Sequence, residues 1–333
     1  MRYRNTVPIR FWLVTLLLAA GASNAAARPP AVAGDRMVRV VTVGQDSLGR
    51  DELFEGTLAR LDQTAAFQPD IACLPEVFSR RPPEPLPGPT SERLAQWARA
   101  HRAYVVFGIK TRIADRVYNS AVLLDRQGRI AGRYDKMHPT EGELEGGVHP
   151  GVTDPPVFET DFGTIGIQIC FDVNWWDGWK RLREKGAKIV FFPAAYPAAR
   201  HVSAIALMNQ FYVVSSAMTR PSRIYDITGR ELASTGHFQE WAGAVLPIGK
   251  RLFEIDRHVA KVRQIQKKYG SRVDVTWYHD DDWFTLASLD PALSVDQVIA
   301  EFGLTPLRDY IAESGAAIDK VRVRAPQHNE VKR

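Results

Sequence analysis

The stretch Gly163-Thr-Ile-Gly-Ile-Gln-Ile-Cys170 and its continuation Phe171-Asp-Val-Asn-Trp-Trp-Asp177 decide how this chain folds. The first part is an apolar run typical of a buried β-strand, and a helical pattern follows from Trp179 to Lys185. Cys170 therefore lies at a turn between strand and helix, where helix N–H groups are expected to point towards its sulfur. Those donors and the helix dipole favour the thiolate, the nucleophilic form of cysteine. The plainer alternative is a small buried hydrophobe, because unpaired cysteine is among the most buried residue types.

Short β-branched runs alternate with helical patterns on both sides of this junction. Fully apolar runs joined by helices predict an α/β fold in which helices cover a sheet, and hairpin patterns show that the sheet is not purely parallel. The expected strands are 38–43, 70–76, 104–109, 117–124, 130–134, 157–158, 164–169, 188–193 and 212–217, followed by a meander over 222–226, 231–234 and 243–248. The expected helices are 53–67, 90–101, 179–185 and 198–209.

The first 27 residues have the pattern of a secretory signal peptide. Arginines at the start precede the apolar run Phe11–Ala20, and small residues follow from Ala22 to Ala27. The apolar run is too short for a bilayer core, which needs roughly 20 residues, although an uncleaved anchor is the alternative. We expect residues 1–27 to be removed, and the mature protein to be periplasmic or extracellular without a membrane segment.

Charge and cysteine content limit the classes of partner. Loss of the three arginines in residues 1–27 lowers the formal charge from +5 to about +2 (5 − 3). A nearly balanced chain gives no reason to expect nucleic acid or an anionic membrane as a partner. Two cysteines, Cys73 and Cys170, are too few for a disulfide scaffold, but an oxidising compartment would allow them to pair. A Cys73–Cys170 disulfide would make the chain a non-catalytic structural or interaction protein.

The remaining residues, about 300, can form one large domain with a sizeable core. The composition changes beyond about Asp290. Ser294–Ser314 can form helices, and Val321–Arg333 is rich in charge. We therefore predict one domain over residues 37–289 and a C-terminal helical extension over residues 290–333.

Two other residues have the chemistry that a cysteine nucleophile requires, which is a proton acceptor and a cation for the developing oxyanion. Glu76 follows the apolar run Ile71–Pro75, where poor hydration suits a carboxylate to proton transfer. Its alternative role is to cap the next turn. Lys136 follows the expected hairpin, and alone it would be read as a solvated surface lysine.

Three motifs in this order resemble the nitrilase (carbon–nitrogen hydrolase) superfamily: Leu74-Pro-Glu76-Val, Tyr134-Asp-Lys136-Met-His138-Pro and Ile169-Cys170-Phe-Asp172. In that family a glutamate, a lysine and a cysteine form the catalytic triad, which the resemblance assigns to Glu76, Lys136 and Cys170. The resemblance extends from about Met37 to Asp256 and includes the segment Tyr118-Asn-Ser120. It implies a four-layer α-β-β-α sandwich that assembles into a homodimer or larger oligomer.

The same resemblance implies a second glutamate that supports the lysine. Thr140-Glu-Gly-Glu143-Leu-Glu145 offers three candidates shortly after Lys136. The spacing from the lysine most resembles the family at Glu143, and Glu145 stays open as the alternative.

The reaction that the resemblance implies is hydrolysis through a thioester. Glu76 takes the proton of Cys170, whose sulfur attacks an amide-type carbonyl or a nitrile carbon. Lys136 and the backbone N–H of Phe171 stabilise the negative charge, and water releases the acid. No metal or cofactor is implied, because the lysine supplies the positive charge. Nitrilases commonly have tryptophan and glutamate after the cysteine, so Phe171 and Asp172 favour a linear amide or N-carbamoyl substrate, with nitrile hydrolysis as the alternative.

Three side chains are further candidates for contact with a small-molecule substrate. Trp175 and Tyr196 could line its pocket, although packing in the core or in a dimer is the alternative for both. Asn174 could bind substrate or cap the following helix. Tyr278-His-Asp-Asp-Asp-Trp283 could suggest a metal site, but adjacent aspartates point in different directions, and we expect a solvated loop.

Overall fold

Two six-stranded sheets form the centre of the computed structural model, which describes residues 35–324. The predicted signal peptide lies outside the described residues, as do residues 325–333 of the predicted extension. The first sheet has the spatial order β12 (Trp241–Pro247), β1 (Met37–Val43), β2 (Ile71–Cys73), β3 (Tyr104–Ile113), β4 (Arg116–Leu124) and β5 (Ile130–Asp135). The second has the order β11 (Glu231–Ser234), β10 (Arg223–Tyr225), β9 (Tyr212–Ala217), β8 (Ile189–Ala194), β7 (Gly163–Ile167) and β6 (Val157–Thr160).

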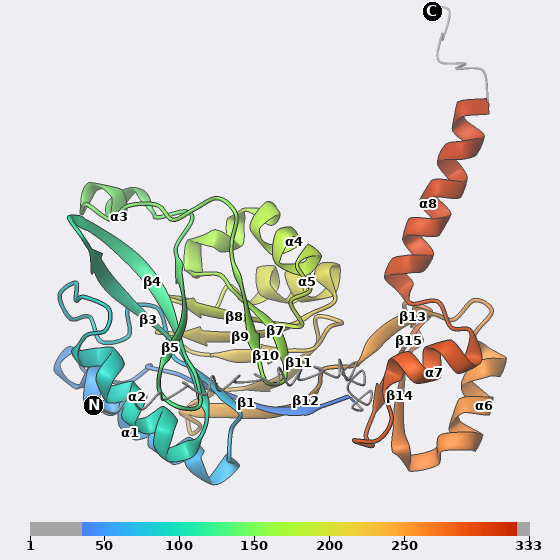
Figure 1. Ribbon diagram of the computed structural model, residues 1–333, viewed down its shortest axis with the longest axis horizontal. Coiled ribbons are helices and arrows are strands. Elements are labelled where there is room, and N and C mark those ends of the chain that lie inside the picture. Colours follow the sequence, from blue (N-terminus) through green and yellow to red (C-terminus); the bar gives the residue numbers. More distant parts are fainter. Residues whose placement is uncertain (1–34, 325–333) are drawn as a thin grey trace, which may run out of the picture. The chain divides into compact units, whose positions relative to one another are not determined.

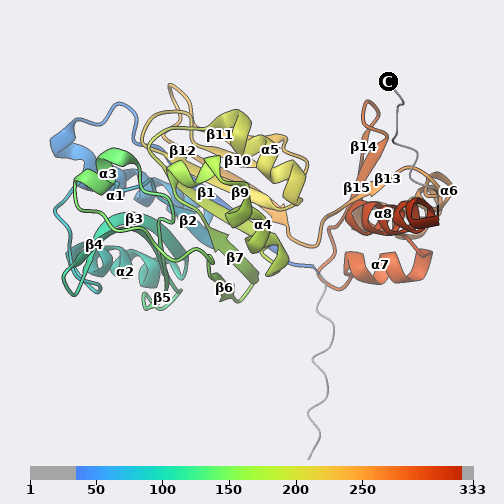
Figure 2. The ribbon, with the colours of Figure 1, turned by 90° about the horizontal axis from the view of Figure 1, so that it is seen from above.

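Strand β1 shows why the sheets are covered on both faces. Val38 and Val40 belong to the core between the two sheets, whereas Val41 and Val43 pack towards the outer helices. Alternate side chains of a strand point to opposite faces, so a fully apolar strand requires a partner layer on each side. Helices α1 (Leu53–Gln63) and α2 (Pro89–His101) cover the first sheet, and α4 (Trp176–Glu184) and α5 (Ala199–Asn209) cover the second (Figures 1 and 2). The predicted four-layer α-β-β-α sandwich is confirmed.

Two strands differ from the expectation in ways that matter for the site. Strand β12 does not continue a meander beside β11; it crosses to the first sheet and pairs antiparallel with β1, from Met37↔Pro247 to Val43↔Trp241. Strand β2 ends at Cys73 rather than at Glu76. Pro75 has no N–H group to donate to the ladder, so Glu76 lies in the turn beyond the strand.

Residues 251–324 form a C-terminal module with its own sheet, in the order β13 (Arg251–Glu254), β15 (Trp283–Ser288) and β14 (Val273–Tyr278). Its helices are α6 (Val259–Tyr269), α7 (Val295–Phe302) and α8 (Leu307–Arg324). Residues such as Phe253, Val262 and Phe284 form a separate core. The division predicted between residues 289 and 290 separates these strands from α7, although Val295 and Val298 of α7 share one core with Phe253 and Phe284. Leu252 and Leu307 attach the module to the main core.

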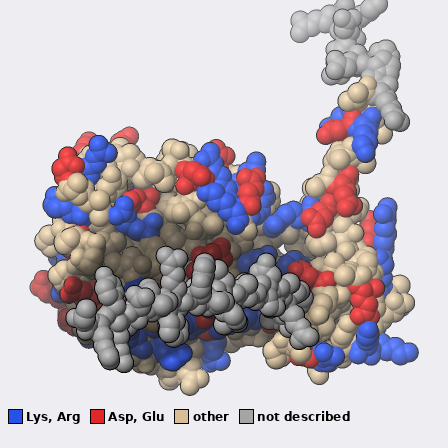
Figure 3. All heavy atoms as spheres, in the orientation of Figure 1, with Lys and Arg blue, Asp and Glu red and all other residues tan. Residues whose placement is uncertain are grey.

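Short elements complete the described chain: α3 (Glu141–Glu145) and the 3₁₀ turns η1 (Arg50–Glu52), η2 (Thr64–Phe67), η3 (Cys170–Asn174) and η4 (Gly270–Arg272). Within residues 35–324, every helix is too short or too polar to cross a bilayer. On the face shown in Figure 3, basic and acidic side chains of the described residues are interspersed rather than segregated.

Candidate active site

Strand ends in the two sheets bring the three principal candidates together. Glu76 follows β2, Lys136 follows β5 and Cys170 follows β7. All three are buried, with exposed fractions of 4%, 2% and 6% respectively. A lysine that is this deeply buried requires paired negative charge, since an isolated buried ammonium is strongly disfavoured.

Lys136 obtains that charge from two carboxylates. Its Nζ donates hydrogen bonds to Glu76 Oε1 at 2.9 Å and to Glu143 Oε2 at 2.7 Å. Burial by itself would lower the pKa of Lys136, but the negative charge of Glu76 and the hydrogen bonds to Glu143 and Glu76 outweigh it, and the pKa is raised. The side chain is therefore a fixed cation in the interior.

Glu143, and not Glu145, supports the lysine. Helix α3 begins with a capping box in which the N–H of Thr140 donates to Glu143 Oε2 at 2.8 Å. Burial raises the pKa of Glu143, but the hydrogen bonds from Lys136 and Thr140 outweigh it, so the pKa lies below its usual value. Glu145 is exposed on the same short helix, which resolves the choice that the sequence left open.

Asn119 on β4 joins the two carboxylates, a role that the sequence did not reveal. Its Nδ2 donates to Glu76 Oε1 at 2.7 Å and to Glu143 Oε1 at 2.6 Å. The available signal was a single amide close to the apolar run Ala121–Leu124, because a buried polar side chain needs a hydrogen-bonding partner. The segment Tyr118-Asn-Ser120 had been noted only as part of the family resemblance.

The surroundings of Cys170 favour the thiol rather than the thiolate that the turn was expected to favour. Burial first, and then the negative charge of Glu76, raise the pKa of Cys170 to about 12, although Lys136 and the N–H of Ala195 act in the opposite direction. Cys170 begins a 3₁₀ turn, and α4 begins at Trp176, so the cysteine is not at the N-terminus of the helix itself. Cys170 is therefore a neutral thiol that requires a base.

Asp172 fixes the turn that presents the cysteine. Cys170 has a φ of +42°, a left-handed conformation that is costly for a residue with a side chain. The buried Asp172 carboxylate accepts hydrogen bonds from Tyr134 Oη at 2.7 Å, from the N–H of Ile169 at 3.0 Å and from the N–H of His138 at 2.9 Å. One carboxylate thus ties the cysteine turn to the segment that carries Lys136.

The alternative of a Cys73–Cys170 disulfide is contradicted, because both cysteines are free. Cys73 lies in the core between the sheets, where it contacts Ser216 and the backbone of Phe192. Its side chain therefore belongs to the packing of the sandwich.

The candidate substrate-binding residues differ in what they contact. Trp175 is 40% exposed and stacks on the His138 ring at 3.9 Å, with the Phe171 ring edge-on at 5.1 Å. Tyr196 is 39% exposed, and burial followed by its proximity to Cys170 and Glu76 raises its pKa, which places it beside the site. Asn174 instead donates from Nδ2 to the Phe171 carbonyl at 3.0 Å, and the cap of α4 is Trp175.

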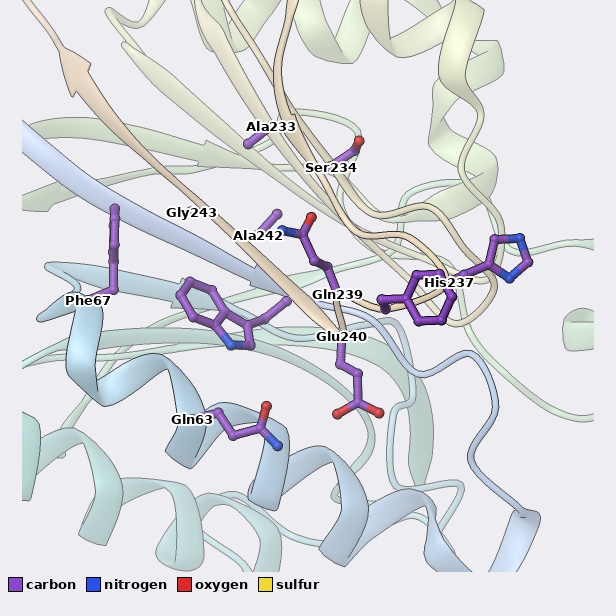
Figure 4. A pocket seen from close by; sticks show the side chains of 11 residues that line it. Gln63, Phe67, Ala233, Ser234, His237, Gln239, Glu240, Ala242 and Gly243 are labelled. Carbon is purple, nitrogen blue, oxygen red and sulfur yellow. The ribbon is translucent and has the colours of Figure 1, made fainter.

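A separate hollow of about 580 Å³ lies where η2, β11 and β12 meet (Figure 4). Phe67, Ser234 and Glu240 are among its lining residues, which include none of Glu76, Lys136 and Cys170. This hollow is therefore distinct from the candidate site. Across the described residues 35–324, no group of three or more His, Cys, Asp or Glu side chains is placed to hold a metal ion. Residues 279–282 form the turn between β14 and β15.

A family model described as Carbon-nitrogen hydrolase matches residues 38–245. The chain belongs to the carbon–nitrogen hydrolase family. The matched segment includes Glu76, Lys136, Glu143 and Cys170, and it ends before the C-terminal module.

Individual relatives match over shorter lengths. A Pseudomonas protegens protein named "Hydrolase in pqqF 5'region" is 31% identical over 178 residues, which are 47% of this chain and 62% of that protein. The deaminated glutathione amidase of Synechocystis sp. is 32% identical over 122 residues, which are 32% of this chain and 45% of that protein. The chain thus spans about half the length of the curated relatives it matches.

The fold has a counterpart among solved structures. Saccharomyces cerevisiae Nit3, described as a member of branch 10 of the nitrilase superfamily, superposes with a TM-score of 0.57 at 18% identity. The superposition covers 71% of this chain and 95% of Nit3. The two proteins share the nitrilase fold, and this carbon–nitrogen hydrolase is a member of the nitrilase superfamily.

Proposed function

We propose that this carbon–nitrogen hydrolase cleaves a linear amide or an N-carbamoyl compound through a thioester on Cys170. One observation carries the proposal: the buried Lys136 ammonium is held between Glu76 and Glu143, at 2.9 and 2.7 Å, beside the neutral thiol of Cys170. Acyl transfer to sulfur needs a base for the thiol and a fixed positive charge for the oxyanion. The three groups supply both.

The first half-reaction forms the thioester. The pKa of Cys170 is about 12, so the thiol is protonated and needs a base. The Glu76 carboxylate takes this proton as the sulfur attacks the carbonyl carbon. The π electrons of the carbonyl move to its oxygen, where Lys136 Nζ and the N–H of Phe171 stabilise the negative charge. When the C–N bond breaks, the proton on Glu76 passes to the departing amine or ammonia.

The second half-reaction returns the enzyme to its starting state. Glu76 takes a proton from water, and the resulting hydroxide attacks the thioester carbon. Collapse of the tetrahedral intermediate breaks the C–S bond, and Cys170 leaves with the proton held by Glu76. Asn119 and Glu143 hold Glu76 and Lys136 in place during both steps. Asn119 donates to both carboxylates, and Glu143 accepts from Lys136.

The substrate class rests on the residues after the cysteine and on one relative. Asp172 follows Phe171 and uses its carboxylate to hold the turn, leaving it unavailable to the reaction. The Synechocystis relative is named an amidase. The residues after the cysteine and the name of this relative support an amide or carbamoyl group, and nitrile hydrolysis stays the alternative because a Pyrococcus abyssi relative is named a nitrilase.

A substrate panel with ammonia detection tests the proposal. Short aliphatic amides, N-carbamoyl amino acids and nitriles are each incubated with the enzyme and with its Cys170→Ala variant. We expect ammonia from amides or carbamoyl compounds with the enzyme, and background rates with the variant. Turnover of nitriles alone would establish the nitrilase alternative, and equal rates with both proteins would refute cysteine catalysis.

We also propose that residues 1–27 direct export, so that the enzyme meets its substrate outside the cytoplasm. The basic start, short apolar run and small residues of this segment support the proposal. N-terminal sequencing of protein from the exported fraction is expected to begin close to residue 28. Cytoplasmic protein that retains Met1 would contradict it.

A further inference from the structure

A small cavity of about 110 Å³ lies at the end of the second sheet opposite to Cys170. Strand β8 separates the two places: Lys188 precedes the strand and lines the cavity, whereas Ala195 follows it and contacts the cysteine. The C-terminal module forms the other wall through Arg251 on β13 and Arg308 in the first turn of α8.

Positive charge is concentrated around this cavity. Lys188, Lys250, Arg251 and Arg308 all line it, with Asp309 as the lining carboxylate. Lys250 pairs with Asp226 at 2.7 Å, and Arg251 pairs with Asp296 at 3.2 Å.

Lys188 and Arg308 lack such compensation. Among the described residues, neither has a carboxylate oxygen within 4.0 Å. Arg308 Nη2 donates instead to the carbonyl of Asn209. The two side chains therefore have carboxylates in their surroundings but form no direct ion pair with them.

The cations repel one another. The pKa of Lys188 is lowered by burial and then by the charges of Arg251 and Arg308, against the opposite effect of Asp296 and Asp35. The pKa of Arg308 is lowered by burial and then by Arg183 and Arg251, against the opposite effect of Asp309. Partly buried like charges are costly, and an anion between them would remove that cost.

We propose that this cavity binds a small tetrahedral dianion, either inorganic phosphate or the phosphate group of a small phosphomonoester, between Lys188, Arg251 and Arg308. The guanidinium groups offer paired donors that match phosphate oxygens, and the lysine adds a point charge. The cavity has room for one such group and not for a large ligand. The Tyr212 hydroxyl is already committed to the Pro247 carbonyl, so binding depends on the cations.

The bound anion connects the second sheet with the C-terminal module. Lys188 belongs to the family segment 38–245, whereas Arg251 and Arg308 lie beyond it. Binding therefore strengthens the attachment of a module that the family model does not include. The chemistry at Cys170 is expected to proceed at the same rate, because the cavity lies at the other end of β8.

Calorimetric titration of the full chain with inorganic phosphate, at constant ionic strength in chloride, tests the proposal. We expect saturable binding at one site, and at least about tenfold weaker binding in Lys188→Gln and in Arg308→Gln, since each loses a charge-assisted hydrogen bond. Lys188→Arg should retain binding. Lys267→Gln on α6 is the matched control, because it removes one exposed charge away from the cavity.

Methyl phosphate in a parallel titration separates the two sources of the dianion. Tighter binding of methyl phosphate identifies a phosphomonoester, and tighter binding of inorganic phosphate identifies the free ion. Absence of saturable binding of either would overturn the proposal. Equal weakening by Lys267→Gln and Lys188→Gln would also overturn it, since the effect would then follow total charge alone. The amide-hydrolysis rate of Lys188→Gln serves as the check that the variant is folded.

Discussion

Lys136 is a buried ion that is paired with two carboxylates. Removing an ammonium and two carboxylates from water is costly, and pairing them often contributes little net stability. The described contacts satisfy the group closely: Lys136 donates to Glu76 and Glu143, and Asn119 donates to both acids. We attribute this network to the proposed reaction rather than to stability, because apolar side chains in its place would be buried at a lower cost in free energy.

Substitution of Glu143 and of Glu145 should have different effects on amide turnover. Glu143→Gln removes the carboxylate that binds Lys136 at 2.7 Å. Hydrogen bonds to charged groups contribute about 1.5–3 kcal/mol, so we expect amide turnover to fall about 10- to 150-fold. Glu145→Gln, on the exposed side of α3, should change the rate by less than about twofold. Equal losses in both variants would show that Glu143 has no special role.

Glu143 also makes stability depend on pH. Its pKa is lowered in the folded protein, so the unfolded chain binds the proton more tightly. The stabilising contribution is complete above the unfolded pKa of about 4.5 and is lost as the pH falls through the lower folded value. Between about pH 5 and pH 3, the Tm of the wild type should fall more steeply than that of Glu143→Gln. An equal fall of Tm with pH in the wild type and in Glu143→Gln would contradict the lowered pKa of Glu143.

Individual residues also show where sequence reasoning ends. Motif order identified Glu76, Lys136 and Cys170 although 60 and 34 positions separate successive members. The protonation state of Cys170 could not be predicted, because it depends on how close Glu76 lies to the sulfur in space. The link through Asn119 likewise depends on the pairing of β4 beside the carboxylates.

At the scale of elements, β3 positions Glu76, the proposed base, through Gly108. A Cβ atom at this residue would lie 2.6 Å from the Cα of Glu76 and 2.8 Å from the Pro75 carbonyl oxygen. These are backbone atoms that cannot rotate away. The absence of a side chain therefore allows the Glu76 turn to approach the strand.

Gly108→Ala should consequently displace Glu76. We expect a loss of about 1–3 kcal/mol in the free energy of unfolding, and a fall in turnover of up to about 100-fold if the base shifts by about 1 Å. Gly142→Ala on α3 is the control, since its Cβ would meet nothing within 4 Å. Urea unfolding and amide turnover measure the two effects, and similar values for both variants would exclude the proposed crowding.

Elements with strong patterns were predicted within a few residues, and the exceptions have physical causes. The expected helix over 198–209 and strand over 212–217 correspond to α5 and β9. The sequence of β12 could not predict which sheet the strand joins, because the same apolar run can pair at the edge of either sheet. Its pairing with β1 is decided by tertiary contacts.

At the scale of the whole molecule, the described chain has a large shared core and a smaller one. The main core joins both large sheets, whereas the C-terminal module packs around residues such as Phe253 and Phe284. Sequence composition indicated a change near Asp290, but the module begins at β13. The strands of the module carry the same kind of apolar residues as the main domain, so composition could not mark the boundary.

The main domain and the C-terminal module should unfold locally in separate steps. Strands β8 and β9 are buried along their whole length, whereas β14 is an edge strand of intermediate burial. We expect native-state hydrogen exchange to show a lower opening free energy for β14 and β15 than for β8 and β9. Identical opening free energies in all four strands would show that the module and the main domain unfold as one unit.

Mass spectrometry of the enzyme quenched during turnover tests the thioester mechanism most directly. With an amide that is hydrolysed, we expect a mass increase equal to the acyl group on the peptide that contains Cys170. The Cys170→Ala variant should show no such increase. Turnover without any adduct on Cys170, or an adduct on Cys73 instead, would contradict it.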